Sequence, residues 1–428
     1  MSALAVGFQV QVAHKIGAQE DEEARSIMKH GFLTGLLFSG LLLVVGLLIY
    51  QKLPIWLGGS SEIVVDSSRY FLIYVLALPV LETEFISSGM LQSSGMVKIS
   101  SAISILICCL DVVFNYILIF PTRVVSVFGH SIAIYGVNLD VAGASLGTVC
   151  AEIVGTGLML YFIFFRVEHF RAPAGREPDS GKVLAPAGRE PDSEEVQAPE
   201  HGFHLVDERY WKHVKKAFLI AYPVAIEEII LGSAQVIITR IVSPLGAVAL
   251  SANSFAITAE SFCYMPGYGI SVAGTTLVGQ SIGAGRKRLA GRFGYLVVGL
   301  GMAIMAGTGA LLYVLAPWIM QILTPVAEVQ ALGVACLRIE AFAEPLFGAA
   351  IVSAGVFRGT GNTLKPSILN LCSMWLIRIP IAALLANRVG LEGVWIAMCV
   401  ELMVRGAVFL VMLISWNMKL KKEVVSAG

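Results

Sequence analysis

The chain has 428 residues, of which 56% are hydrophobic and 14% are charged, and its mean hydropathy is +0.78. Soluble proteins carry about 25% charged residues, so a water-soluble fold could not bury this much apolar surface. The formal net charge is zero, which gives no reason to expect a nucleic-acid partner. The composition therefore predicts an all-α, polytopic membrane protein.

Apolar runs long enough to cross a bilayer, which takes about 17–25 residues, recur along most of the chain. They cover residues 31–49, 70–91, 99–120, 142–165, 217–242, 246–275, 293–318, 332–357, 367–386 and 392–416. A shorter run from Ser2 to Ala13 resembles the end of another span. It does not fit a signal peptide, because no basic region precedes it and no small-residue cleavage site ends it. Eleven spans are expected.

Basic residues are distributed unevenly between the two sides of this arrangement. If the segment after the first run is cytoplasmic, 22 of the 30 Lys and Arg residues lie on the cytoplasmic side and four on the other. Four more fall within spans and do not cluster along the chain, namely Arg240, Arg338, Arg378 and Arg405. The asymmetry follows the positive-inside rule and predicts the orientation of a multi-pass protein. The cell (plasma) membrane is its expected location.

An internal repeat divides the chain into two copies. The segment Val12–Ala18 recurs as Val278–Ala284, an offset of 266 residues, and the same offset relates Pro79 to Pro345. Six predicted crossings separate the copies, so they share one topology and are related by an axis along the membrane normal. This predicts two pseudo-symmetric helical lobes, over residues 1–165 and 211–428.

The first copy has five spans and the second has six, because the counterpart of 217–242 would precede Met1. A natural truncation, a misassigned start codon and a fragment are the three explanations. Between the lobes, residues 166–210 are rich in Pro, Gly and charged residues, and Ala172–Ser180 recurs verbatim as Ala185–Ser193. We expect a flexible cytoplasmic linker there, with a regulatory role as the alternative.

Ten acidic residues fall within predicted spans. An ionised side chain at mid-bilayer costs about 2.5–3.5 kcal/mol, so most of the ten must face protein or water, or lie near a span end. They are Glu82, Glu84, Asp111, Glu152, Glu227, Glu228, Glu260, Glu340, Glu344 and Glu401.

Glu227 and Glu228 are the leading candidates for ion and substrate binding. They lie about ten residues into a span, one turn after Pro223, and adjacent helical positions point about 100° apart. One can therefore face a cavity while the other meets a neighbouring helix. A carboxylate that binds H⁺ or Na⁺ and a cationic substrate in competition performs antiport chemistry; the alternative is a pair of hydrogen-bonded packing residues.

Asp111 and Asn115 form a second candidate pair at i, i+4 spacing on one helix face. Isoleucines replace them in the second copy, at 377 and 381, so the polar pair is specific to one lobe. The asymmetry favours a functional role, with a structural polar contact as the alternative.

A third group of candidates lies in the second copy. Glu340 and Glu344 are one turn apart just before Pro345, which suits a kinked gate or an ion site unless Arg338 neutralises them. Glu260 lines a cavity or lies on a packed face. Glu401 and Arg405 are expected to compensate each other, and Glu82, Glu84 and Glu152 receive no role.

Six stretches resemble the multidrug and toxic compound extrusion (MATE) family: Val12–Arg25, Gly89–Gly95, Leu110–Phe120, Ser243–Ala252, Met265–Gly285 and Phe357–Pro366. The resemblance implies two six-helix lobes in a V around a central cavity. It also implies export of organic cations and other drugs in exchange for H⁺ or Na⁺, with no other cofactor and no catalytic or metal-binding residues. A monomer in the lipid bilayer with small, cationic or amphipathic substrates is expected.

Two features depart from the family pattern. The usual first helix, which in one branch carries an ion-linked aspartate, is absent. That branch also has an amide followed by an acid on its fifth helix, whereas here Asp111 precedes Asn115. The acid-bearing seventh helix of other branches resembles 217–242.

Two alternatives remain. A flippase or exporter of lipid-linked or polysaccharide precursors would share the fold, but it would need clustered cationic residues for pyrophosphate. An enzyme or a channel is disfavoured by the lack of histidine and metal motifs and of a repeated filter-like loop.

Overall fold

The computed structural model describes residues 2–56, 61–127, 130–170 and 208–426, which are almost entirely helical. The predicted linker with its tandem repeat lies largely in 171–207, outside the described residues. The first half contains α1 (Ser2–Gly17), α2 (Asp21–Ile49), α3 (Leu53–Trp56), α4 (Ser61–Ser93), α5 (Val97–Ile119), β1 (Pro121–Val127), β2 (His130–Val137), α6 (Asp140–Phe165) and η1 (Glu168–Phe170). The second half contains α7 (Glu208–Val242), η2 (Ser243–Leu245), α8 (Ala247–Gly283), α9 (Lys287–Leu323), α10 (Ala327–Glu340), α11 (Glu344–Gly359), α12 (Leu364–Ser373), η3 (Met374–Arg378), α13 (Ile379–Val389) and α14 (Leu391–Ser426).

Eight of the described helical segments are long and apolar enough to cross a membrane, and α10 with α11 would make a ninth. The polytopic all-α prediction is therefore confirmed, while the division into five plus six spans stays a prediction. Helices α10 and α11 meet at a 60° bend, at the position where Pro345 predicts one.

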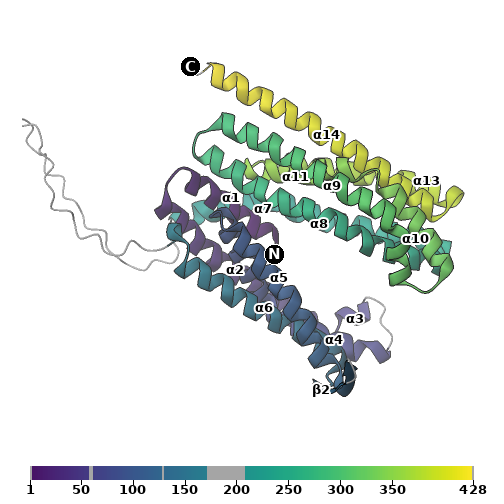
Figure 1. The fold of residues 1–428 in the computed structure, drawn as a ribbon. Helices are drawn as coiled ribbons and strands as arrows, with labels where there is room; N and C mark the ends of the chain where they lie inside the picture. The colour runs from purple at the N-terminus through teal and green to yellow at the C-terminus, as the bar shows by residue number, and fades with distance from the viewer. Residues whose placement is uncertain (1, 57–60, 128–129, 171–207, 427–428) are drawn as a thin grey trace, which may run out of the picture.

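A β-hairpin connects α5 to α6, where the sequence analysis predicted no strand. Strands β1 and β2 pair antiparallel with Pro121 opposite Val137. The hairpin projects from the end of the first bundle opposite the α1–α2 turn (Figure 1).

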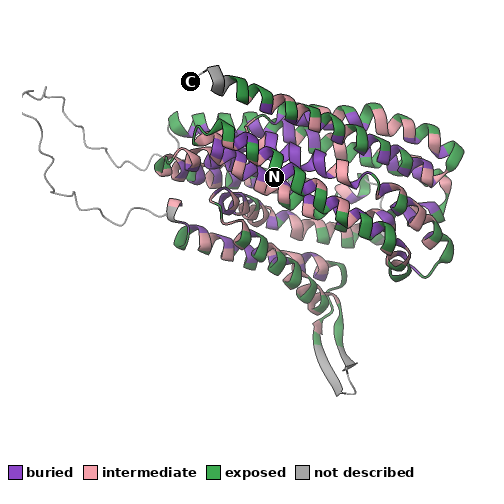
Figure 2. Ribbon diagram, turned by 45° about the horizontal axis from the view of Figure 1, so that its top comes forward, coloured by how far each residue is buried: buried purple, intermediate pink, exposed green. Residues whose placement is uncertain are grey.

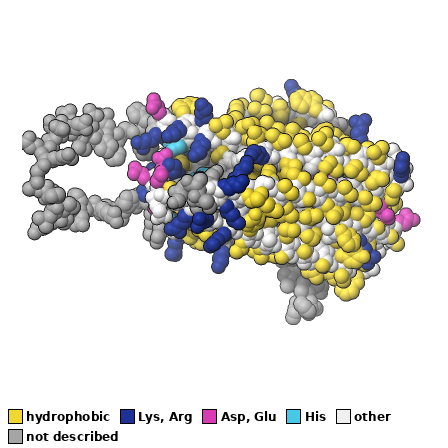
Figure 3. Space-filling view, turned by 90° about the horizontal axis from the view of Figure 1, so that it is seen from above, with side chains coloured by type: hydrophobic (Ala, Val, Ile, Leu, Met, Phe, Trp, Pro, Cys, Tyr) yellow, Lys and Arg dark blue, Asp and Glu magenta, His cyan; other side chains and the backbone are white. Residues whose placement is uncertain are grey.

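The helices form two bundles arranged as a V (Figure 1). Helices α1 to α6 build one bundle and α8 to α14 the other, and the bundles meet where α1 packs against α7 and α8. Figure 2 shows buried residues concentrated between the helices, while the outward faces are exposed. Figure 3 shows a broad hydrophobic surface with Lys and Arg gathered at one end, as the predicted orientation requires.

The two copies of the repeat contact each other through reciprocal hydrogen bonds. His14 Nε2 lies 2.7 Å from the Gly359 carbonyl oxygen, and Gln280 Nε2 donates to the Ser93 carbonyl oxygen at 2.8 Å. Both members of one bond map onto the other by the offset of 266 residues. The repeated segments therefore lie together on one face of the molecule, as the duplication predicts.

Backbone contacts at this junction are equally reciprocal. A Cβ added to Gly17 would clash with the Gln280 carbonyl, and one added to Gly283 would clash with the His14 carbonyl. The helices can approach this closely because neither glycine has a side chain. Gly95 and Gly361 are also equivalent positions of the repeat. Both have left-handed backbone conformations, with φ of 85° and 81°.

We expect Gly283→Ala to lower stability by about 1–3 kcal/mol, because its methyl group would push against backbone that cannot move aside. The measurement is thermal unfolding of the purified protein in detergent. Gly157→Ala is the matched control, since Gly157 lies within α6 with open space around its Cβ position. Equal unfolding temperatures for the two variants would contradict the close contact between the lobes.

Candidate transport site

The predicted site residues divide between the two bundles. Asp111 and Asn115 lie on α5 in the first bundle. The other five lie in the second half of the chain, with Glu227 and Glu228 on α7, Glu260 on α8, Glu340 at the end of α10 and Glu344 at the start of α11. Their assignment as binding residues stays a prediction.

Glu227 is buried between α7 and α12, and both of its carboxylate oxygens accept hydrogen bonds. Ser367 Oγ donates to Oε2 at 2.5 Å, and Asn370 Nδ2 donates to Oε1 at 2.6 Å. Ser367 and Asn370 are three residues apart, so α12 presents both on one face. Hydrogen bonds to a charged acceptor are about twice as strong as neutral ones, which is how a carboxylate can be held here.

Glu228, the next residue, is exposed, and both glutamates line a cavity of about 150 Å³. Tyr268, Phe347, Arg358 and Arg405 contribute to the same wall. The volume has room for several water molecules or a small cation. The adjacent glutamates therefore share one cavity but differ in burial and in hydrogen bonding.

A second cluster of charges is buried beside this cavity. Arg378 interacts electrostatically with Glu260, Glu340 and Glu401, all three of which are buried. Glu401 accepts a hydrogen bond from Ser373 Oγ at 2.6 Å. The tertiary fold thus brings acids from α8, α10 and α14 around one arginine.

Arg405 connects the cluster to the cavity. Its Nε lies 3.2 Å from Glu401 Oε1, and its guanidinium lies 5.4 Å from the centre of the Phe347 ring. The compensation expected between Glu401 and Arg405 is present. Because Arg405 also lines the cavity, it lies between the cavity and the buried cluster.

Two expectations about basic residues were wrong. Arg338 does not neutralise Glu340 and Glu344, because it is exposed and lies over the Tyr313 ring, 5.3 Å from its centre. Arg378 and Arg405 do cluster, although 27 residues separate them, because α14 packs against η3. Sequence distance gave no indication of this contact.

Glu340 and Glu344 are completely buried, and their carboxylate oxygens have no hydrogen-bond partner among the described residues. Leaving a buried polar group without a partner costs about 1–3 kcal/mol, and more for a charge. A bound proton or cation would remove this cost, so the bend between α10 and α11 is a suitable place for one.

The first bundle has its own acidic group. Glu152 on α6 interacts electrostatically with Asp111 on α5 and with Glu84 on α4. Asn115 lies directly against Gly147 of α6, where a Cβ would clash with its side chain. Glu84 and Glu152, to which the sequence analysis assigned no role, therefore belong with the predicted pair.

The sequence analysis missed Ser367, Asn370, Tyr268, Arg358 and Arg378. The first two had a detectable signal, because polar residues at i, i+3 in an apolar span are unusual. Arg378 ends η3, a single π-helical turn, and such turns occur frequently at functional sites.

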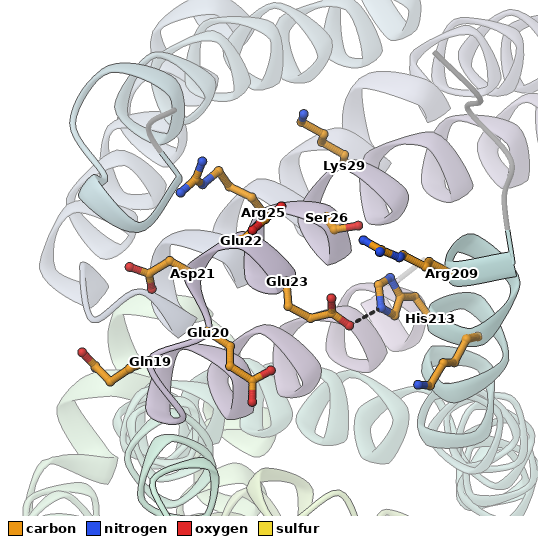
Figure 4. A pocket seen from close by; sticks show the side chains of 11 residues that line it. Gln19, Glu20, Asp21, Glu22, Glu23, Arg25, Ser26, Lys29, Arg209 and His213 are labelled. Atoms are coloured by element: carbon orange, nitrogen blue, oxygen red, sulfur yellow. Dashed lines mark hydrogen bonds and ion pairs between the residues drawn. The ribbon is translucent and has the colours of Figure 1, made fainter. Parts of the chain in front are cut away.

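A larger cavity of about 1000 Å³ opens at the end where the bundles meet. Figure 4 shows its charged wall, built from the α1–α2 turn and the starts of α2 and α7. His213 Nε2 lies 3.0 Å from Glu23 Oε1, and this contact ties α7 to α2. The cavity contains no predicted site residue and lies at the end that the sequence predicts to be cytoplasmic.

Two duplicated bundles joined at one end, with buried carboxylates facing a cavity, define a two-lobe secondary transporter. The sequence model of the MatE family matches residues 1–117 and 223–384. The chain belongs to the MatE family.

Relatives and solved structures agree with this membership. The chain is 25% identical over 420 residues to "Probable multidrug resistance protein NorM" of Thermotoga maritima, covering 96% of this chain and 80% of the relative. It is 22% identical to "Uncharacterized transporter YisQ" of Bacillus subtilis, covering 95% and 80%. A MATE crystal structure in complex with MaL6 matches with a TM-score of 0.81 at 18% identity, covering 98% of this chain and 85% of that one. An outward-facing multidrug resistance MATE transporter matches with a TM-score of 0.80 at 17% identity, covering 98% and 84%.

We expect Arg405→Met to destabilise the protein by about 3–5 kcal/mol, because it leaves Glu401 buried without its ion-pair partner. The double variant with Glu401→Met should recover much of the loss. Equilibrium unfolding in mixed detergents measures both. Arg338→Met, at an exposed position on α10, is the control and should change stability by at most about 0.5 kcal/mol. A loss as large in the control would rule out a specific role for the buried pair.

Proposed function

We propose that the protein exports organic cations and other drugs by antiport, with Glu227 and Glu228 as the residues that bind the coupling ion and the substrate. The observation that carries the proposal is the contrast between the two neighbours. Both line the cavity, but Glu227 is buried and hydrogen-bonded to Ser367 and Asn370, whereas Glu228 is exposed. Multidrug resistance proteins among the relatives support drugs as the substrate class.

Competition for negative charge is the proposed mechanism. A cationic drug at the cavity is attracted by Glu228 and by the acids behind Arg405. A proton or Na⁺ that binds the same carboxylates removes this attraction, and the drug is released on the far side. Since the two states differ in their affinity for each ligand, the ion gradient can drive the substrate out.

Charge balance favours this substrate class over lipid-linked precursors. The buried cluster has four acids, Glu260, Glu340, Glu344 and Glu401, against two arginines, Arg378 and Arg405. The cavity itself is lined by two acids, Glu227 and Glu228, and two arginines, Arg358 and Arg405, so the acids behind it favour a cation over a pyrophosphate.

The finer assignments are part of the proposal. Coupling to H⁺ or Na⁺, the cell (plasma) membrane as the location and a monomeric state are inferred from the family plan and the charge asymmetry. Cationic or amphipathic substrates are inferred from the acids.

We expect Glu228→Gln to lower ethidium efflux from everted vesicles about tenfold or more, the loss expected when a charged contact worth about 1.5–3 kcal/mol disappears. Glu227→Gln should flatten the pH dependence of efflux, because an amide cannot exchange a proton. Glu328→Gln is the matched control, since Glu328 is exposed at the start of α10. Normal rates and a normal pH profile in both variants would remove the pair from the mechanism.

The coupling ion can be identified in the same vesicles with imposed gradients. If protons drive export, a pH gradient alone should support efflux and a proton ionophore should abolish it. If sodium does, a Na⁺ gradient should restore efflux in the presence of the ionophore. Efflux that responds to neither gradient would contradict antiport.

A further inference from the structure

We propose that the cytoplasmic ends of α9 and α14 form a binding site for the headgroup of an anionic phospholipid. The site is a cavity of about 460 Å³, separate from the proposed transport site. Its wall consists of Arg288, Arg292, Tyr295, Asn417, Leu420 and Lys421. The volume is within the range of sites for small organic ligands.

The basic groups converge from two helices. Arg288 and Arg292 are one turn apart on α9, and Lys421 comes from α14. All three are exposed, and no described acidic side chain forms an ion pair with them. Three unpaired cations around one cavity attract an anion, and arginine binds phosphate oxygens bidentately.

Helix packing fixes the shape of the cavity. Gly291 of α9 lies so close to α14 that a Cβ would clash with Asn417 Oδ1. The Asn417 amide donates to the Gly291 carbonyl oxygen at 3.4 Å, and Trp416 packs over Gly294. Close packing between α9 and α14 therefore forms the floor of the cavity, while the basic side chains around it remain accessible. The first turn of α9 adds the positive end of the helix dipole.

The apolar surface next to the basic groups indicates a lipid rather than a soluble anion. Exposed Leu296 and Leu300 continue the face of α9 that carries Arg292, so an apolar track begins where the basic groups end. Tyr295 stands at this boundary, where tyrosine is enriched in membrane proteins. Basic pockets between helices on the cytoplasmic side bind anionic headgroups, and acyl chains would follow the leucines.

The test uses the full-length protein, purified and delipidated, with native mass spectrometry to measure lipid binding. Phosphatidylglycerol and phosphatidylcholine with identical acyl chains are the probes, and inorganic phosphate is the soluble competitor. We expect preferential binding of phosphatidylglycerol. In the Arg288→Gln/Arg292→Gln variant, its affinity should fall about fivefold for each residue removed.

Lys98→Gln/Lys365→Gln is the matched control, because each lysine is the second residue of its helix, as Arg288 is in α9, and each is exposed. The control should bind phosphatidylglycerol like the parent protein. If the arginine variant does not fold, Lys421→Gln alone should lower the affinity about fivefold.

Three results would overturn the proposal. The first is unchanged binding in the variants of the cavity. The second is an equal loss in the control, which would mean a general effect of charge. The third is displacement of phosphatidylglycerol by millimolar phosphate, which would identify a soluble-anion site.

Discussion

The contact between the two copies of the repeat is the constraint on which the rest of the structure depends. His14 and Gln280 occupy equivalent positions, and each lies against a backbone carbonyl of the other half of the chain. Gly17 and Gly283 let the backbones touch. Because helices in lipid gain no hydrophobic energy from meeting each other, close packing and buried hydrogen bonds have to hold the lobes together. The junction closes one end of the V and leaves the other end to diverge.

Burying charged side chains in the bundles costs free energy. Glu227, Glu260, Glu340 and Glu401 are buried because each of their helices turns them toward the bundle interior. Arg378 and Arg405 compensate part of the charge, and Ser367 and Asn370 stabilise Glu227. The carboxylates at the bend stay without partners among the described residues. A protein that only needed to be stable would not keep such groups, and their presence supports the proposed ion exchange.

The two lobes are copies in backbone but not in chemistry. Asp111 and Asn115 belong to an acidic group in the first bundle, while isoleucines stand at the equivalent positions in the second. The larger acidic cluster lies in the second bundle, around a bent helix and a π turn. Symmetry supplies the two-lobe frame, and the substitutions within it create an asymmetric interior.

The sequence by itself determined the class of fold, the duplication, the gathering of basic residues at one end and the bend at Pro345. These properties follow from local quantities: apolar length, charge placement and the offset between similar motifs. The division of Glu227 and Glu228 between a helix contact and a cavity was not found, since both line the same cavity and differ instead in burial. Only the tertiary structure decided which groups meet. It paired Glu227 with α12, placed Arg378 among three acids and moved Arg338 away from Glu340, because helix rotation and packing partners depend on contacts between residues far apart in the chain. The β-hairpin and the lipid-facing cavity of α9 and α14 depend on the same long-range packing and gave no pattern that could be recognised in advance.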